Sequence, residues 1–167
     1  ANRRMRHDDA YTPDGRHGMR PDYPSIVYSK ILKQLFPDVP VVLGGIEASL
    51  RRLTHYDYWE DKLKKCILCE SGADIILYGM GEKNTLQLCR ELENGRSIKD
   101  VKDIPQTVYL AKKEDIPGGI TDTDIVLHSH EECLRNKKAQ AENFRHIEEE
   151  SNKMHAQRLI QAVDGKY

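Results

Sequence analysis

The chain has no feature that marks a membrane protein or a secreted one. Its longest apolar runs, VVL and DIILYGM, fall far short of the ~20 residues that a membrane helix needs. The N-terminal stretch ANRRMRHDDAY is polar and differs from a secretory signal. Net charge is also lacking, because 26 basic and 27 acidic residues leave a formal charge of -1. We therefore expect neither a membrane partner nor a nucleic-acid partner.

Cysteine is scarce and the common catalytic motifs are absent. Four cysteines in a chain of intracellular composition favour reduced thiols and a cytoplasmic location. The sequence holds no nucleophile elbow, no HExxH and no paired catalytic carboxylates. Its glycines form neither GxGxxG nor a P-loop pattern, so nucleotide binding is unsupported. We expect no catalytic residue and no bound cofactor in this chain.

Two short clusters contain potential metal ligands. Cys66 and Cys69 form a CxxC near the predicted C-terminal end of a helix, in an apolar context that favours core thiols over a redox pair. His128, His130 and Cys133 form H-x-H-x-x-C, but no fourth ligand lies nearby in the sequence. We interpret the second cluster as ordinary surface residues and expect no metal site.

The hydrophobic pattern predicts alternating helices and strands between residues 25 and 95. Apolar positions at helical spacing indicate a helix from Ser25 to Phe36, which Pro37 ends. Short apolar runs at 39–43 and 74–78 are typical of parallel strands that are covered on both faces. One helix or a pair of short helices, Ala48–Leu53 and Trp59–Cys69, is expected between them, and a helix at 84–93 after them. This alternation predicts an α/β layer fold with a parallel sheet.

The last third of the chain has a different pattern. Strands are predicted at 106–111 and 125–127, and Ser129 with Glu132 forms a capping box. A single long polar helix is expected from about residue 131 to 163, with a thin apolar stripe that includes Phe144 and Met154. The predicted organisation is a polar lead-in segment, an α/β partial domain, a β-rich linker and a C-terminal helix, at 1–24, 25–104, 105–128 and 129–167.

Polar and aromatic residues gather just after the two predicted parallel strands, where α/β folds place their ligands. The glycines there could serve a tight turn or a ligand contact, and the turn is favoured. The polar-aromatic stretch that follows suits a pocket wall or a domain interface as well as it suits local packing. The candidate pocket or interface comprises Gly44, Gly45, Glu47, Ser49, Arg51, Arg52, His55, Tyr56, Asp57, Tyr58, Trp59, Gly79, Gly81 and Glu82.

Several long and irregular strings support a family resemblance. RRMRHDDAYTPDG, RPDYPSIVYSK, PDVPVVLGGIEASLRRLTHYDYW and ADIILYGMGEK resemble the N-terminal region of YgiQ-type radical SAM proteins. The pieces PDVPVVLGG and ILYGMGE are also similar to strand–helix units of cobalamin-binding-like domains. The resemblance implies a partial doubly wound sheet of cobalamin-binding-like or flavodoxin-like type. It also implies a [4Fe-4S] cluster and S-adenosylmethionine for the full-length parent.

This chain departs from the family pattern in ways that shape the functional expectation. It contains neither the CxxxCxxC triplet that binds the cluster nor the DxHxxG motif of cobalamin domains. We therefore expect a non-catalytic N-terminal accessory fragment whose partner is the radical SAM domain of the same polypeptide. The alternative is a free-standing scaffold module that binds proteins through an exposed strand edge and its long helix. Open sheet edges also predict a homo-oligomer for the isolated fragment.

Overall fold

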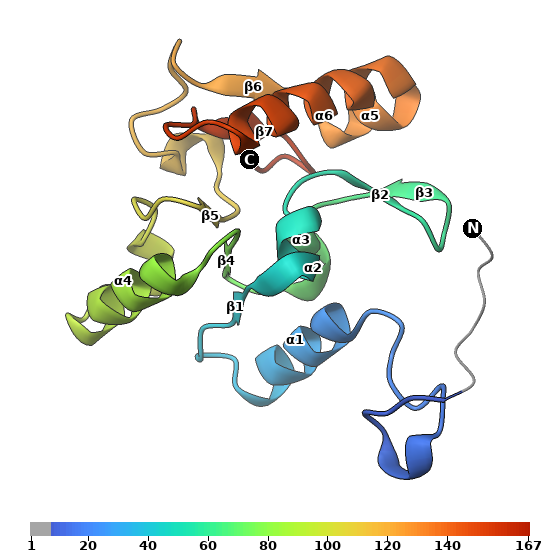
Figure 1. Ribbon diagram of the computed structural model, residues 1–167. Helices are drawn as coiled ribbons and strands as arrows, with labels where there is room; N and C mark the ends of the chain where they lie inside the picture. Colours follow the sequence, from blue (N-terminus) through green and yellow to red (C-terminus); the bar gives the residue numbers. More distant parts are fainter. Residues whose placement is uncertain (1–7) are drawn as a thin grey trace.

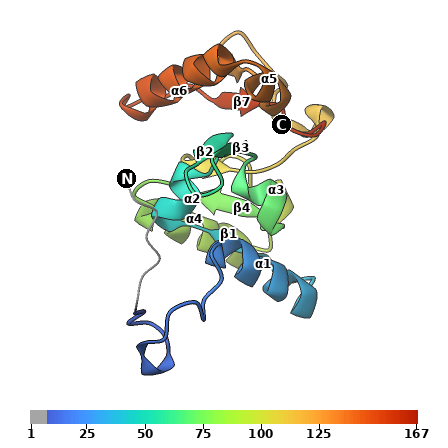
Figure 2. The same cartoon turned by 90° about the vertical axis from the view of Figure 1, so that its right-hand side faces the viewer.

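The computed structural model describes residues 8–167 of the chain, and its parts are arranged in layers (Figures 1 and 2). A short 3₁₀ turn, Pro13–Gly15, precedes helix α1 (Pro24–Leu35), so the helix predicted after residue 24 is confirmed. Proline at the first helical position is favoured because its missing amide hydrogen would have no partner there. Residues 1–7 of the predicted lead-in segment lie outside the described residues.

The centre of the fold is a small three-stranded sheet in the order β1 (Val42–Leu43), β4 (Ile75–Leu77), β5 (Thr107–Val108). Strands β1 and β4 are parallel neighbours, which confirms the predicted pairing of the two apolar runs. Strand β5 runs antiparallel on the other side of β4. The chain is therefore a mixed α/β protein, although its sheets are smaller than the sequence suggested.

Helices cover both faces of this sheet, because the side chains of β4 alternate between two cores. Ile76 packs with α1 and with α3 (Ile67–Ser71), and α1 contacts α3 directly. Ile75 and Leu77 point the other way and pack against Leu88 of α4 (Glu82–Glu93). Both isoleucines are fully buried. The alternation follows from the two-residue period of a strand.

The predicted helix at 59–69 is wrong. After α2 (Gly45–Leu50) the chain forms a hairpin of β2 (His55–Asp57) and β3 (Lys62–Lys64), in which His55 lies opposite Lys64. Asp61 holds a positive φ of 56° in the turn, and an aspartate tolerates this conformation better than most residues. Helix α3 is consequently short and begins only at Ile67.

The single long C-terminal helix is also wrong. Two helices, α5 (His130–Arg135) and α6 (Lys137–Ser151), are separated by Asn136, whose extended backbone breaks the helix and whose side chain caps α6 by accepting from the Lys138 amide at 3.0 Å. The predicted capping box of Ser129 and Glu132 is confirmed. Phe144 and Met154 are exposed, so the expected apolar stripe does not form a buried seam.

Beyond α6 the chain forms β7 (Leu159–Gln161), which pairs in parallel with β6 (Ile125–Leu127). This second sheet and the helices α5 and α6 form a layer above the three-stranded sheet, and α1 lies on the opposite side (Figure 2). The layers are connected through Thr54, whose amide donates to the Gln161 side chain at 2.8 Å and whose hydroxyl lies 3.1 Å from His130 Nδ1. Short 3₁₀ turns at Ile98–Asp100 and Lys113–Asp115 lie in the connecting segments.

Candidate functional site

The two glycine-rich strand ends lie side by side, as their positions after parallel strands require. Gly79, which follows β4, donates its amide to the Ser49 hydroxyl on α2 at 3.2 Å. Gly45 opens α2 with a φ of 78° and Gly79 has a φ of 74°, conformations that favour glycine. Gly44 is extended and caps α2, with no positive φ to explain it. Gly45 and Gly79 thus have the backbone conformations that tight turns require of glycine.

Three of the charged candidates form an inward-facing network. The Arg51 guanidinium lies 3.2 Å from the Glu47 carboxylate and 3.8 Å from the Asp57 carboxylate, whose side chain is only 1% exposed. Glu47 in turn accepts a hydrogen bond from the Ser25 hydroxyl on α1. These contacts join α1, α2 and the β2–β3 hairpin. In the described structure, Glu47, Arg51 and Asp57 are thus engaged with one another and with α1.

Tyr23 lies at the centre of this network, although the sequence did not single it out. Its hydroxyl lies 3.1 Å from the Asp57 carboxylate and 3.0 Å from the Glu60 carboxylate, and its single proton can be donated to either. Its ring lies below two cations, with the Lys64 ammonium at 3.8 Å and the Arg51 guanidinium at 5.2 Å from the centroid. Cations prefer the negative face of an aromatic ring. No periodicity in the sequence could have revealed this residue, because its partners are distant along the chain.

The pKa values of the network follow from these contacts. Burial alone would raise the pKa of Asp57, but hydrogen bonds from the Glu60 amide and Tyr23 lower it overall, together with the nearby charges of Lys64 and Arg51. The pKa of Glu60 is lowered to about 2, first by its hydrogen bond with Lys62 and then by those with Lys64 and Tyr23. Carboxylates in such surroundings remain ionised. The network thus consists of fixed, mutually compensated charges and is poorly suited to proton transfer.

Arg52 and His55 are held by the protein rather than offered to solvent. The Arg52 guanidinium donates to the Ser49 carbonyl at 2.5 Å and to Ser151 at 3.3 Å, and lies 4.8 Å from the Tyr78 ring centroid. His55 Nδ1 lies 3.1 Å from the Leu53 carbonyl, and its buried Nε2 has no hydrogen-bond partner among the described residues. Burial lowers the pKa of His55, so its ring is neutral at physiological pH.

Most of the remaining candidates are exposed. Tyr56, Tyr58 and Trp59 lie on the hairpin, and the last two rings meet edge to face with centroids 6.0 Å apart. Gly81 precedes α4, and Glu82 is its exposed first residue. Sequence reasoning missed three further apolar residues of this region, Ile46, Leu50 and Met80. Ile46 and Leu50 are spaced four apart and therefore share one side of α2, which is the signal that could have identified them.

We define the docking face as the large apolar and aromatic side chains of α2, the hairpin and the turn after β4. Each member is between 42% and 81% exposed. The three segments are neighbours, because Arg51 at the end of α2 contacts Asp57 in the hairpin and Ser49 contacts Gly79. Single exposed apolar residues are normal, whereas contiguous exposed apolar patches mark interaction surfaces. Its members are Ile46, Leu50, Tyr56, Tyr58, Trp59 and Met80.

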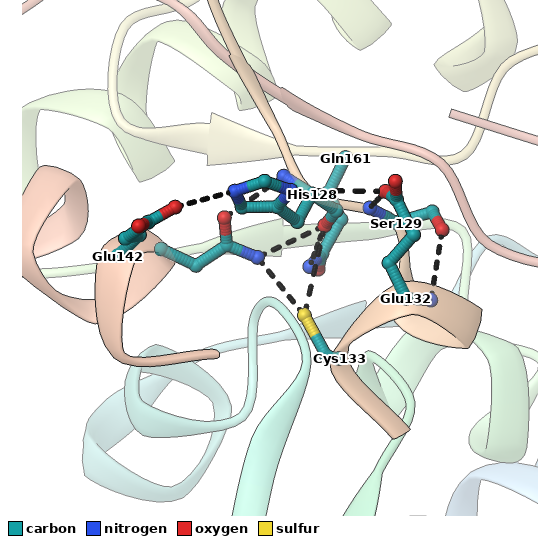
Figure 3. A network of polar contacts seen from close by, with 7 residues as sticks. His128, Ser129, Glu132, Cys133, Glu142 and Gln161 are labelled. Carbon is teal, nitrogen blue, oxygen red and sulfur yellow. Dashed lines mark hydrogen bonds and ion pairs between the residues drawn. The ribbon is translucent and has the colours of Figure 1, made fainter. Parts of the chain in front are cut away.

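The histidine–cysteine cluster is a structural network (Figure 3). His128 Nε2 lies 2.7 Å from Glu142, and Asn143 donates to the His128 carbonyl at 2.9 Å and contacts the Cys133 sulfur at 3.2 Å. His130 and Cys133 are buried, so the prediction that they are surface residues is wrong, whereas His128 is partly exposed. These contacts hold β6, α5 and α6 together.

The other cysteine pair lies in the core, but at the start of α3 rather than at the end of a helix. Cys66 is the N-cap residue, and its burial raises the pKa of the thiol to about 12. In residues 8–167 no group of three His, Cys, Asp or Glu side chains could hold a metal ion. The described part of the chain therefore does not fit the [4Fe-4S] cluster of radical SAM enzymes, and no helix in it is long and apolar enough to cross a bilayer.

Comparisons with known proteins relate the whole chain to one family. UPF0313 proteins of Bacteroides thetaiotaomicron and Porphyromonas gingivalis are 58% and 57% identical to it, over 99% and 98% of this chain. A UPF0313 protein of Geobacter sulfurreducens is 44% identical over 95% of it. The chain spans only 28%, 26% and 26% of these relatives' own lengths. No solved structure matches. The model of the family described as "Radical SAM N-terminal" matches residues 1–167, so the chain belongs to this family, as the resemblance predicted.

Proposed function

We propose that the chain is the non-catalytic N-terminal accessory part of a radical SAM enzyme, and that it docks on the radical SAM domain of the same polypeptide. The family assignment and the much greater length of the relatives support this role. The cluster and S-adenosylmethionine would then be held by that second domain. The free thiols of the described residues agree with a reducing, cytoplasmic environment.

The observation that carries the proposal is the docking face. Three aromatic rings and three aliphatic side chains are exposed on segments that an internal charge network holds in place. Interfaces concentrate their energy in aromatic residues such as tryptophan and tyrosine, which combine large contact areas with few rotatable bonds. Because Arg51 and Asp57 fix the hairpin against α2, the rings on it are presented in a defined position.

We also infer that the sheet is part of a larger doubly wound sheet of cobalamin-binding-like type. Helices pack on both faces of β4, and β1 and β4 are parallel and linked by a helical connection. Right-handed crossovers place successive helices on one face when strands are added in one direction. Since α1 lies on the same face as α3, a strand preceding α1 would add beside β1, at the free edge of the sheet.

Alanine substitutions in the full-length protein test the docking. Tyr58→Ala combined with Trp59→Ala should expose the boundary between the two domains to limited proteolysis, because the substitutions remove most of the aromatic contact area. The control is Phe144→Ala on α6, which removes an exposed aromatic ring elsewhere. If the double variant and the control are cleaved at the same rate as the parent, the docking face has no such role.

The alternative function, a free-standing scaffold module, is weakened because its proposed long helix is divided in two. We nevertheless propose that the isolated chain self-associates, since within residues 8–167 β1 pairs only with β4, and Ile31, Leu35 and Phe36 in and after α1 are exposed. Unpaired edges readily pair with another chain. Light scattering should give more than the 19.2 kDa of a monomer. A single species of 19.2 kDa would refute self-association.

A further inference from the structure

A cleft of about 790 Å³ separates the three-stranded sheet from the β6–β7 layer. Its lining includes residues 107–111 from the β5 segment, residues 159–161 of β7, and Tyr167. Neither β5 nor β7 has a strand partner on the side that lines this cleft. Among residues 8–167, the cleft is therefore bounded by two free strand edges, which is unusual for a small-molecule site.

The chain reverses direction at the end of the cleft through a tight hairpin. Val163 and Lys166 exchange two backbone hydrogen bonds of 2.9 Å, and the residues between them, Asp164 and Gly165, both have positive φ values of 49° and 72°. Two central residues with positive φ define a type I′ turn, whose twist matches that of the flanking strands of a hairpin. Lys166 therefore begins a strand that runs antiparallel to β7.

The same strand also begins to pair with the other wall. Tyr167 and Ala111 exchange two backbone hydrogen bonds of 2.8 Å, which is the pattern of an antiparallel pair. Lys166 thus bonds to the β7 side and Tyr167 to the β5 side. Alternating residues of a strand bond to alternating neighbours, so this two-residue segment already has the geometry of a central strand.

Further main-chain amides and carbonyls on β5 and β7 point into the cleft in the register that Lys166 and Tyr167 begin. On β5, Gln106 accepts from Tyr78 of β4, so Thr107 and Tyr109 direct their main-chain groups away from β4, as Ala111 does. On β7, the carbonyls of Arg158 and Ala162 accept hydrogen bonds from the amides of Ile125 and His130. The main-chain amides and carbonyls of Leu159 and Gln161 therefore point the other way, toward the cleft. Within residues 8–167, the amides of Thr107 and Tyr109 donate to no backbone carbonyl.

We propose that the residues that follow Tyr167 in the full-length polypeptide fill this cleft as one extended strand. The first residue after Tyr167 would bond to Gln161, and the second would bond to Tyr109. The strand would unite both sheets into the order β1, β4, β5, new strand, β7, β6. The inference rests on the proposed role as part of a longer polypeptide, and it assigns the cleft to the chain itself rather than to a ligand.

Cysteine pairing in the full-length protein tests the register. The first residue after Tyr167 would lie opposite Leu110 in a non-hydrogen-bonded pair, where Cα atoms are roughly 4.5 Å apart and a disulfide is allowed. Leu110→Cys combined with cysteine at that first position should form an intramolecular disulfide in most molecules under mild oxidation, mapped by mass spectrometry. The matched control moves the second cysteine one residue further, which turns its side chain to the opposite face and should abolish the disulfide.

Hydrogen exchange provides a second readout without substitutions. In the full-length protein the Tyr109 amide should be protected to within roughly tenfold of the Tyr78 amide, which bonds to β5. A disulfide between two copies, equal disulfide formation in the control, or rapid exchange at Tyr109 would overturn the proposal. Rapid exchange at Tyr109 with an effect of the Tyr58 and Trp59 substitutions would reject the strand but retain the docking function. Protection at Tyr109 without an effect of the Tyr58 and Trp59 substitutions would support the strand but reject the docking function.

Discussion

Replacing Asp57 with asparagine should destabilise the chain substantially, because this carboxylate holds the buried network together. It accepts hydrogen bonds from Tyr23 at 3.1 Å and from the Glu60 amide at 2.9 Å, and it faces Arg51 at 3.8 Å. The asparagine side chain would be nearly isosteric, but its amide group is a donor placed among donors. A hydrogen bond to a charged group contributes about 1.5–3 kcal/mol, and breaking a buried ion pair costs about 3–5 kcal/mol.

We expect Asp57→Asn to lower the free energy of unfolding by about 2–4 kcal/mol at neutral pH, since the amide oxygen keeps one of the acceptor positions. Urea denaturation followed by circular dichroism measures this difference, with an unchanged dependence on denaturant. The control is Asp61→Asn in the same hairpin, at an exposed position whose positive φ asparagine tolerates. It should change stability by less than about 0.5 kcal/mol.

The pH dependence provides an independent check on the same residue. The folded-state pKa of Asp57 lies below its usual 3.8, so its contribution is fully present above that pH and disappears as the pH falls through the folded-state pKa. The stability difference between the parent and Asp57→Asn should therefore shrink in acid. A difference below about 0.5 kcal/mol at pH 7, or one that grows in acid, would refute the role assigned to this carboxylate.

Three further predictions follow from other parts of the structure. Gly45→Ala should cost about 1 kcal/mol more than Gly44→Ala in urea denaturation, because only Gly45 has a positive φ, and equal costs would contradict this. The hydrogen bond with Arg158 lowers the pKa of Asp124 to about 2, so this contribution is present above pH 3.8 and lost toward pH 2. Asp124→Asn should accordingly be less stable than the parent at pH 7 and should lose less stability than the parent on acidification. If both lose the same stability in acid, the role assigned to Asp124 is refuted. Iodoacetamide at pH 8 should modify exposed Cys89 well before Cys66, whose pKa burial raises to about 12, and the reverse order in mass spectra would show that Cys66 is accessible.

The sequence predicted the elements whose signals are local. The helix after Pro24, the parallel runs around Val42 and Ile76, and the capping box at Ser129 all form as expected. Each depends on neighbouring residues or on a short apolar run that is followed by glycine. The β2–β3 hairpin was missed because its turn has no Asn-Gly or Asp-Gly pair, and a hairpin and a helix are hard to distinguish in so short a polar-aromatic stretch.

In the C-terminal region, secondary structure depends on partners that are distant in the sequence. The segment around Leu159–Gln161 is a strand because β6 lies beside it, far earlier in the chain at Ile125–Leu127, and no local pattern records that partner. The candidate site residues likewise separate into two groups according to partners that are distant in the sequence. Its charges face Tyr23 and Lys64, which are supplied by other elements, whereas its rings face outward. Spacing alone could not separate the two groups.

The docking face makes the central claim directly testable in the full-length protein. A photoreactive amino acid in place of Tyr58 reports which part of the polypeptide lies against the hairpin. We expect intramolecular cross-links to the radical SAM domain, and none when the probe replaces Phe144. Cross-links confined to other copies of the protein, or an equal yield from both positions, would contradict it.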